Sequence, residues 1–297
     1  MSDDGRIALL RLVSETNGPG HLRPGQVVAE QFTVVRFIAR GGMGLIYEAR
    51  GPGGERVAIK TVSQAVDDPE ARARFEREAE AMSRLTHAGI VGVHAFGRLE
   101  DGAYFMVMEY LEGVPLTQII ARGPVAPAQV AAMLRQVLFA LGYAHAMGVI
   151  HRDLKPDNLM VGADGQARMI DFGIAKLIDD VARGKLTRPG MVFGTPFYMS
   201  PEQATGRPVD GRVDQYSAGV ILFQALTGRV PFMADDIASM LRMHALEPPP
   251  ALAAVTGWAF APALEAVVAR ALAKRADDRF PDMRAMALAL DAATHVA

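Results

Sequence analysis

The chain has 297 residues, half of them apolar, which suits one domain of two parts or two small domains. Its 31 Lys and Arg residues nearly balance its 33 Asp and Glu residues, so the net charge of −2 does not indicate nucleic acid or an anionic membrane surface as a partner. The absence of cysteine excludes disulfides and thiolate chemistry and fits a reducing compartment, so we expect a cytoplasmic location. No apolar run approaches the length of a membrane span, and the acidic N-terminus does not resemble a signal peptide.

The first 28 residues form an extension that we expect to be flexible, because it ends in the Gly- and Pro-rich stretches Gly18-Pro19-Gly20 and Pro24-Gly25. Two strands are then predicted over residues 32–38 and 45–49, on either side of a glycine-rich turn. Such a turn lets the backbone approach phosphates closely, although an ordinary hairpin would explain it equally well. It is not a P-loop, because no Gly-Lys-Ser/Thr follows, and it does not open a helix as a dinucleotide-binding turn must.

The next strand ends at Lys60, and its alternation places Ala58 and Lys60 on one face. A lysine that faces inward requires a charged partner, because burying a charge alone is costly. The helix predicted from residue 68 to residue 85 carries Glu78 within its apolar stripe. We therefore expect a Lys60–Glu78 ion pair, although a lysine on a solvent-facing edge strand is the simpler alternative.

The stretch His151-Arg152-Asp153-Leu154-Lys155-Pro156-Asp157-Asn158 and the later Asp171-Phe172-Gly173 carry the chemistry. Asp153 can accept a hydroxyl proton, and Lys155 can neutralise charge on a phosphate in transfer. Asn158 and Asp171 supply the oxygen ligands that magnesium prefers. Each motif alone would be weak evidence, since either can occur in an ordinary surface turn.

Their spacing strengthens the case. Two short apolar runs flank the turn 163–166, which contains Asp-Gly, and this pattern predicts a hairpin between Asn158 and Asp171. The hairpin would bring these two side chains together. From residue 112 onward helices dominate, including a long one over residues 127–147 that is closed by Gly148. We interpret His145 on its apolar face as a packed core histidine.

With these motifs in their order, the chain resembles eukaryotic-type protein serine/threonine kinases, in particular the bacterial subgroup, over residues 30–291. The resemblance implies an α+β, two-lobed fold. A small antiparallel sheet with one key helix would occupy residues 29–111, including the hinge, and a larger helical lobe would occupy residues 112–297. It also implies ATP and Mg²⁺ as cofactors and proteins that carry Ser or Thr as substrates.

The family pattern assigns further roles. Lys60 and Glu78 would support catalysis beside Asp153, Lys155 and Asn158. The structural residues would be Arg152, Asp214, Glu202 and Arg279: Asp214 would hold the backbone of the His-Arg-Asp turn, and Glu202 would pair with Arg279. The residues expected to contact ATP are Ala39, Gly41, Gly42, Gly44, Ile46, Ala58, Lys60, Met108, Glu109, Leu111 and Met160.

Two positions depart from the family pattern. Ala39 replaces the first glycine of the usual glycine-rich loop, so we expect less freedom in the loop without loss of binding. Ser200 replaces the Ala of Ala-Pro-Glu, as in bacterial relatives. Arg152, a cation beside the Asp153 position, indicates activation by a phosphate on the activation segment.

Thr187 is the only hydroxyl residue between Asp171 and Thr195, so we predict autophosphorylation at Thr187. One copy of the chain could phosphorylate the other within a homodimer.

Two alternatives remain open. A small-molecule phosphotransferase of the antibiotic-kinase type would share the Asp and Asn residues, but it would not be expected to carry Asp214 or Arg279. A kinase fold that serves only as a binding scaffold would lack affinity for Mg-ATP. Because bacterial relatives often carry a membrane anchor after the kinase domain, the chain is expected to be either a soluble kinase or a fragment of an anchored one.

Overall fold

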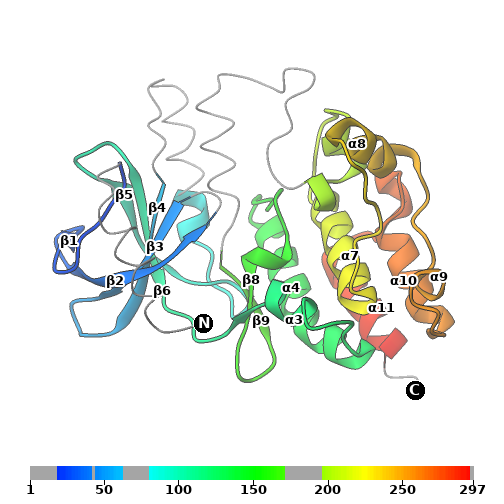
Figure 1. Cartoon of the computed structure of the whole chain (residues 1–297), viewed down its shortest axis with the longest axis horizontal. Helices are drawn as coiled ribbons and strands as arrows, with labels where there is room; N and C mark the ends of the chain where they lie inside the picture. The colour runs from blue at the N-terminus through cyan, green and yellow to red at the C-terminus, as the bar shows by residue number, and fades with distance from the viewer. Residues whose placement is uncertain (1–18, 42–43, 63–79, 171–195, 295–297) are drawn as a thin grey trace. The chain divides into compact units, whose positions relative to one another are not determined.

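A computed structural model describes residues 19–41, 44–62, 80–170 and 196–294 (Figure 1). Within this part of the chain there are two compact units. The sheet unit contains the described residues of 19–84 together with 92–110. The helical unit contains residues 85–91, 111–170 and 196–294.

The sheet unit is built on six antiparallel strands in the order β1-β2-β3-β4-β6-β5. The strands are β1 (Val27–Val28), β2 (Phe32–Gly41), β3 (Gly44–Arg50), β4 (Arg56–Val62), β5 (Val93–Arg98) and β6 (Tyr104–Glu109). The strands β2 and β3 are joined through the glycine-rich turn, as predicted. Of the predicted helix at 68–85, the described residues 80–83 are helical.

Alternation along the strands separates the two faces of this sheet. Val57 and Ile59 of β4 are fully buried in one apolar cluster with Tyr47 of β3. Ala58 and Lys60 are half-buried and point to the opposite face, as the alternation predicted. The face away from the core is therefore the one that carries Lys60.

Residues 19–28, which the sequence assigned to the extension, are attached to the sheet. The Thr61 hydroxyl donates to the Gly20 carbonyl oxygen at 2.7 Å, and the Gly20 N–H donates to Asp101 Oδ2 at 2.7 Å. The N–H of Leu22 donates to the Tyr47 hydroxyl at 3.2 Å, and the Leu22 side chain lies in the core cluster. These residues thus contribute to the stability of the sheet unit.

We expect Thr61→Val to lower the free energy of unfolding by about 1–2 kcal/mol, because the buried Gly20 carbonyl loses its donor while the side-chain shape is kept. Denaturant titration measures this change. Thr33→Val is the control, since Thr33 is exposed on β2 and its replacement should change stability by less than about 0.5 kcal/mol. Equal stability of the two variants would contradict the attachment of residues 19–28.

The helical unit contains a small three-stranded sheet and a set of helices. The strands are β7 (Val114–Pro115), β8 (Leu159–Val161) and β9 (Ala167–Met169). The helices are α3 (Leu116–Ile120), α4 (Pro127–Ala146), α6 (Pro201–Ala204), α7 (Arg212–Thr227), α8 (Ile237–Leu246), α9 (Leu252–Thr256), α10 (Pro262–Ala271) and α11 (Met283–Thr294). Three short 3₁₀ turns are η1 (Pro156–Asn158), η2 (Pro196–Tyr198) and η3 (Ala276–Asp278).

Two helices form the centre of the helical unit. Helix α4 starts with Pro127 at its first position and is followed by Gly148 at φ 76°, which confirms the long helix predicted at 127–147. Its apolar stripe packs against α7 and α11. Helix α7 is buried continuously from Val213 to Phe223, so a polar group on it lies inside the protein. The α+β character predicted from the sequence is confirmed in these two units.

Candidate active site

A hairpin at the start of the candidate site is confirmed. Strands β8 and β9 pair antiparallel, with Leu159 opposite Met169, and Gly165 takes φ 76° in the turn between them. The Ile170 N–H donates to the Asn158 carbonyl oxygen at 3.0 Å. The strand therefore returns the chain to Asn158 at the residue that precedes Asp171, which itself lies outside the described residues.

The turn before the hairpin has an unusual backbone. Arg152 has φ 62°, and the Asp153 N–H donates across it to the His151 carbonyl oxygen at 2.8 Å. This is the hydrogen bond of a γ-turn, and a positive φ is costly for a residue with a side chain. His151 and Leu154 are buried on either side of the turn, which leaves Asp153 only partly covered.

Three of the predicted catalytic residues lie together beyond this turn. Lys155 Nζ donates to Asp153 Oδ2 at 2.9 Å, and both side chains are 15% exposed. Asn158 Nδ2 donates to the Asp153 carbonyl oxygen at 2.9 Å. This bond orients the buried amide so that Oδ1 is the atom directed away from the Asp153 backbone.

Asp214 supports the turn from inside the helical unit. Its Oδ2 accepts from the His151 N–H and its Oδ1 from the Arg152 N–H, both at 2.9 Å. Because Asp214 is fully buried on α7, its carboxylate needs hydrogen-bond donors, and these two amides and the nearby His145 supply them. The carboxylate thus holds the backbone on the N-terminal side of Asp153.

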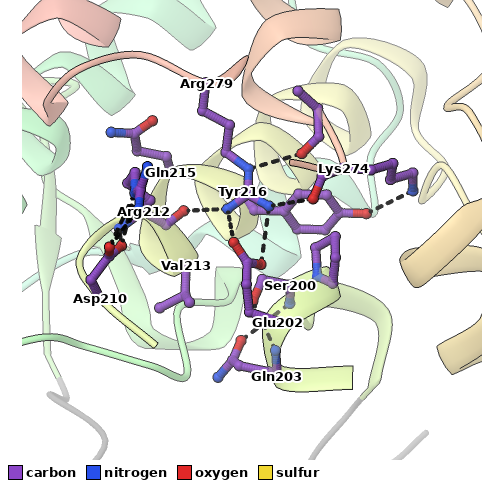
Figure 2. A network of polar contacts seen from close by, with 12 residues as sticks. Ser200, Glu202, Gln203, Asp210, Arg212, Val213, Gln215, Tyr216, Lys274 and Arg279 are labelled. Carbon is purple, nitrogen blue, oxygen red and sulfur yellow. Dashed lines mark hydrogen bonds and ion pairs between the residues drawn. The ribbon is translucent and has the colours of Figure 1, made fainter. Parts of the chain in front are cut away.

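An ion pair joins Glu202 to the buried Arg279 (Figure 2). Arg279 Nη2 donates to Glu202 Oε2 at 3.0 Å, and Nη1 lies 2.9 Å from Oε1, so both carboxylate oxygens contact the guanidinium and one of them accepts a hydrogen bond from it. The Arg279 side chain is fully buried and also donates to the carbonyl oxygens of Ala273 and Arg212. The guanidinium therefore ties α6 and α7 to the segment before α11.

The sheet unit carries most of the residues expected to contact ATP. Across the strands, Ala39 is opposite Ile46, Ile46 is opposite Lys60, and Ala58 is opposite Met108. Residues that face each other in a ladder share a face of the sheet, so these five lie on the face away from the apolar core. Gly41 pairs with Gly44 at the glycine-rich turn, and the Glu109 N–H donates to the Gly92 carbonyl oxygen at 2.9 Å.

Comparison with known families identifies the family of this chain: the sequence model of the protein kinase domain matches residues 32–280. The chain belongs to the protein kinase family. This confirms the resemblance and the two-lobed kinase fold that it implied.

Three curated relatives of this kinase-family chain illustrate the similarity. Serine/threonine-protein kinase pkn3 of Myxococcus xanthus is 43% identical over 264 residues, covering 86% of this chain and 48% of the relative. Pkn1 of the same organism is 41% identical over 301 residues, covering 96% and 43%. PknD of Mycobacterium tuberculosis is 38% identical over 261 residues, covering 87% and 39%. The chain thus spans less than half the length of these relatives.

The remaining predicted site residues of this kinase-family chain fall into two groups. Leu111 and Met160 are half-buried and belong to the helical unit. Gly42, Glu78, Asp171 and Thr187 lie outside the described residues, so the Lys60–Glu78 pair stays a prediction. In the part of the chain that the structure describes, no helix is both long and apolar enough to cross a membrane.

Magnesium fits the donor set of this site. The orientation of the Asn158 amide presents an oxygen, and Asp171 supplies a carboxylate one residue after the hairpin bond at Ile170. Magnesium takes hard oxygen ligands and commonly uses only one or two protein groups, with phosphates and water completing the octahedron. Asn158, the described member of this pair, is therefore compatible with the divalent metal that the family implies.

His145 has a more specific position than the sequence indicated. Its Nε2 lies 2.7 Å from Asp214 Oδ2 and donates to it, because a carboxylate oxygen accepts. The histidine is thus half-buried against the carboxylate that holds the turn at Arg152, and is not simply packed in the core. Helical periodicity placed it on the correct face of α4, but no sequence signal connected it to a residue on α7.

A buried polar cluster lies next to the Glu202–Arg279 pair. The Tyr216 hydroxyl is 3.0 Å from His244 Nδ1, and Lys274 Nζ donates to the His244 carbonyl oxygen at 2.8 Å. Burial, and then the charge of Lys274, lower the pKa of His244 to about 4. Burial, and then the charge of Arg279, lower the pKa of Lys274 to about 8. His244 is therefore neutral in the folded protein at neutral pH.

This predicts a pH dependence of stability. Because the unfolded His244 titrates near pH 6.5 and the folded one near pH 4, the unfolded chain binds more protons between these values, and stability falls as the pH falls. From pH 7 to pH 5 we expect His244 to remove about 2 kcal/mol from the free energy of unfolding. Denaturant titrations of wild type and His244→Gln should show the difference between them shrinking by that amount. If the stability of wild type and of His244→Gln changed equally with pH, His244 would not be the source of this pH dependence.

Proposed function

We propose that this chain transfers the γ-phosphate of Mg-ATP to Ser and Thr hydroxyls of proteins. The observation that carries the proposal is the single loop that sets the Asp153 carboxylate 2.9 Å from the Lys155 ammonium and bonds the Asn158 amide to the Asp153 backbone. Phosphoryl transfer requires little covalent chemistry from a protein, and it depends on positioning and on stabilisation of charge. This loop offers both.

Asp153 is the residue that would orient the attacking hydroxyl and accept its proton. Its carboxylate is partly exposed, so a substrate hydroxyl can reach it, and its backbone is held in the γ-turn. Lys155, whose ammonium contacts the same carboxylate, would neutralise charge on the phosphate as it is transferred. The two residues therefore act on the two ends of the bond that forms.

Residues of the sheet unit, with Leu111 and Met160 of the helical unit, would bind the nucleotide. Lys60 would contact the phosphates with Glu78 as its partner, and Ile46, Ala58 and Met160 would enclose the adenine. Met108 would lie behind the base, while Glu109 and Leu111 would offer backbone groups to its edge. The ladder that places Ile46, Lys60, Ala58 and Met108 on one face supports this assignment.

Asn158 and Asp171 would hold the metal. A bound magnesium ion supplies positive charge that stabilises the phosphate oxygens during transfer. The protein contributes the fixed direction of Asn158 Oδ1, which is set by the bond from Nδ2 to the Asp153 carbonyl oxygen. The bound nucleotide would then lie close to Asp153, the proposed base.

Protein substrates and Ser/Thr selectivity are supported by the names of the relatives and by Lys155, which resembles the serine/threonine subclass. A cytoplasmic location stays a prediction. A kinase fold that serves only as a binding scaffold is disfavoured because no catalytic position is missing from the sequence.

Activation would follow autophosphorylation of Thr187, in trans within a transient homodimer, with Arg152 as a cation for the added phosphate. Arg183, Lys185 and Arg188 surround this threonine in the sequence. We expect phosphopeptide mapping of active enzyme to find phosphate on Thr187, and Thr187→Ala to lower activity. Active enzyme with unmodified Thr187 would contradict this route of activation.

The direct test uses the purified chain with γ-labelled ATP, with and without Mg²⁺, and three acceptors: a protein mixture, an aminoglycoside, and none. The proposal predicts label on Ser and Thr of protein only, dependent on Mg²⁺ and abolished in Lys60→Met. Label on the aminoglycoside alone would favour the small-molecule alternative. Absence of nucleotide binding would favour the scaffold.

A further inference from the structure

Gln203, which follows Glu202 in α6, connects two parts of the helical unit through one side chain. Its Nε2 donates to the Arg152 carbonyl oxygen at 2.7 Å, and its Oε1 accepts from the Ser200 N–H at 3.1 Å. Its own N–H donates to the Ser200 hydroxyl at 3.3 Å, completing a capping box at the start of α6 (Figure 2). The side-chain amide of Gln203 thus accepts a hydrogen bond with its oxygen at the cap of α6 and donates one with its nitrogen to Arg152.

The bond to Arg152 acts on the peptide unit that carries the proposed base. The Arg152 carbonyl and the Asp153 N–H belong to the same planar peptide group. The carbonyl end accepts from Gln203 at 2.7 Å, and the amide end donates to the His151 carbonyl oxygen at 2.8 Å. Rotation of this plane would break both bonds. The two hydrogen bonds therefore fix the orientation of the peptide group, and with it the position of the Asp153 backbone nitrogen.

This support is needed because of the strain at Arg152. A backbone conformation such as φ 62° is unfavourable for a residue with a side chain, which keeps it only when its surroundings impose it. On the N-terminal side of Arg152, Asp214 accepts from its N–H. On the C-terminal side, the Gln203 amide donates to its carbonyl oxygen.

Capping alone does not explain why this residue is glutamine. A glutamate at the third helical position completes a capping box as well as glutamine does, because only the acceptor oxygen is used. A carboxylate cannot donate to the Arg152 carbonyl oxygen. The property that distinguishes glutamine here is therefore its N–H donor, which points at the catalytic turn and not at the helix.

We infer that Gln203 is a positioning residue for Asp153 and that it couples α6, which is capped by Ser200, to the turn that holds the base. The inference rests on the proposed function for its catalytic consequence, although the contact itself does not. The coupling means that a displacement of α6 would release the strained Arg152 peptide. Catalysis should therefore depend on the Gln203 donor.

Two variants separate the donor from the cap. Gln203→Glu keeps the capping acceptor and the size of the side chain but loses the donor, and Gln203→Met loses both. With Mg-ATP and a protein substrate at pH 8, we expect each to lower kcat about tenfold, the effect of one lost hydrogen bond, while KM for ATP changes by less than about twofold. Ser200→Ala is the control, because it removes the cap hydroxyl but leaves the bond from Gln203 to Arg152; it should lower Tm without lowering kcat.

The pH profile distinguishes positioning from damage to the fold. A protonated carboxyl can donate, so the kcat of Gln203→Glu, divided by that of wild type, should rise about twofold as the pH falls from 8 to 5. The same ratio for Gln203→Met should stay level, since methionine has no proton to gain in this pH range. A level ratio for both variants, an unchanged kcat, or an equal loss in Ser200→Ala would overturn the inference.

Hydrogen exchange of residues 150–158 gives a readout that does not need the enzyme to turn over. We expect faster exchange of the amides of this turn in Gln203→Glu than in Ser200→Ala, because only the former releases the Arg152 peptide. Equal exchange in the two variants would overturn the contact. If wild type phosphorylates no protein while exchange still differs, the proposed function fails and the structural coupling stands.

Discussion

Asp153→Asn is expected to lower kcat for protein phosphorylation by a factor on the order of one hundred or more, while nucleotide affinity changes little. Asparagine has nearly the same shape as aspartate and can keep its place in the turn, but it cannot accept the proton of the attacking hydroxyl. The Lys155 ammonium also loses the negative charge of the carboxylate that it contacts at 2.9 Å. Initial rates at saturating ATP and a separate nucleotide-binding titration measure the two quantities.

Asp157→Asn is the matched control for this variant. Asp157 is in the same loop and is exposed, and no hydrogen bond joins it to Asp153 or Asn158 in the described structure. Its replacement should leave kcat within about twofold of wild type, as for surface substitutions away from a site. Wild-type turnover in Asp153→Asn would mean that another group accepts the proton.

Arg279→Met is expected to lower the free energy of unfolding by about 3–5 kcal/mol, the cost of removing one partner of a buried ion pair. Methionine fills much of the space of arginine but leaves the Glu202 carboxylate without the guanidinium that contacts both of its oxygens. The carbonyl oxygens of Ala273 and Arg212 lose their donor as well. Denaturant titration at pH 7 measures the loss.

Arg275→Ala provides the comparison for Arg279, because both arginines lie next to η3. The ion pair of Arg275 with Asp278 spans 3.7 Å, and its side chains are 77% and 60% exposed. A pair so exposed contributes little, so the variant should lose less than about 1 kcal/mol. A loss of that small size in Arg279→Met would show that the buried pair does not stabilise the helical unit.

Local chemistry made the hairpin and the strands predictable. The Asp-Gly turn between two apolar runs specified β8 and β9, since Gly165 adopts the positive φ that such a turn needs. Alternation in β4 specified which face receives Lys60, because the side-chain period of a strand is two. The helix α4 could be predicted from its proline start, its apolar stripe and its terminal glycine.

Contacts between distant parts of the chain could not be predicted in the same way. Gln203 reaches the Arg152 carbonyl over 51 positions, and His145 reaches Asp214 over 69. Nothing in the local pattern of either residue specifies its partner, since a glutamine in a capping box and a histidine on an apolar helix face have ordinary local explanations. The attachment of residues 19–28 was missed because Leu22 stands alone among Gly and Pro residues, with no periodicity to indicate burial.

The central claim is that the chain gathers Asp153, Asn158 and Asp171 around a divalent ion and the outermost phosphate of a nucleotide. A crystal structure with Mg²⁺ and a non-hydrolysable ATP analogue tests it most directly. We predict a magnesium ion about 2.0–2.1 Å from Asn158 Oδ1 and from an Asp171 carboxylate oxygen, with the Asp153 carboxylate facing the γ-phosphate. A metal bound elsewhere, or a γ-phosphate remote from Asp153, would contradict the account.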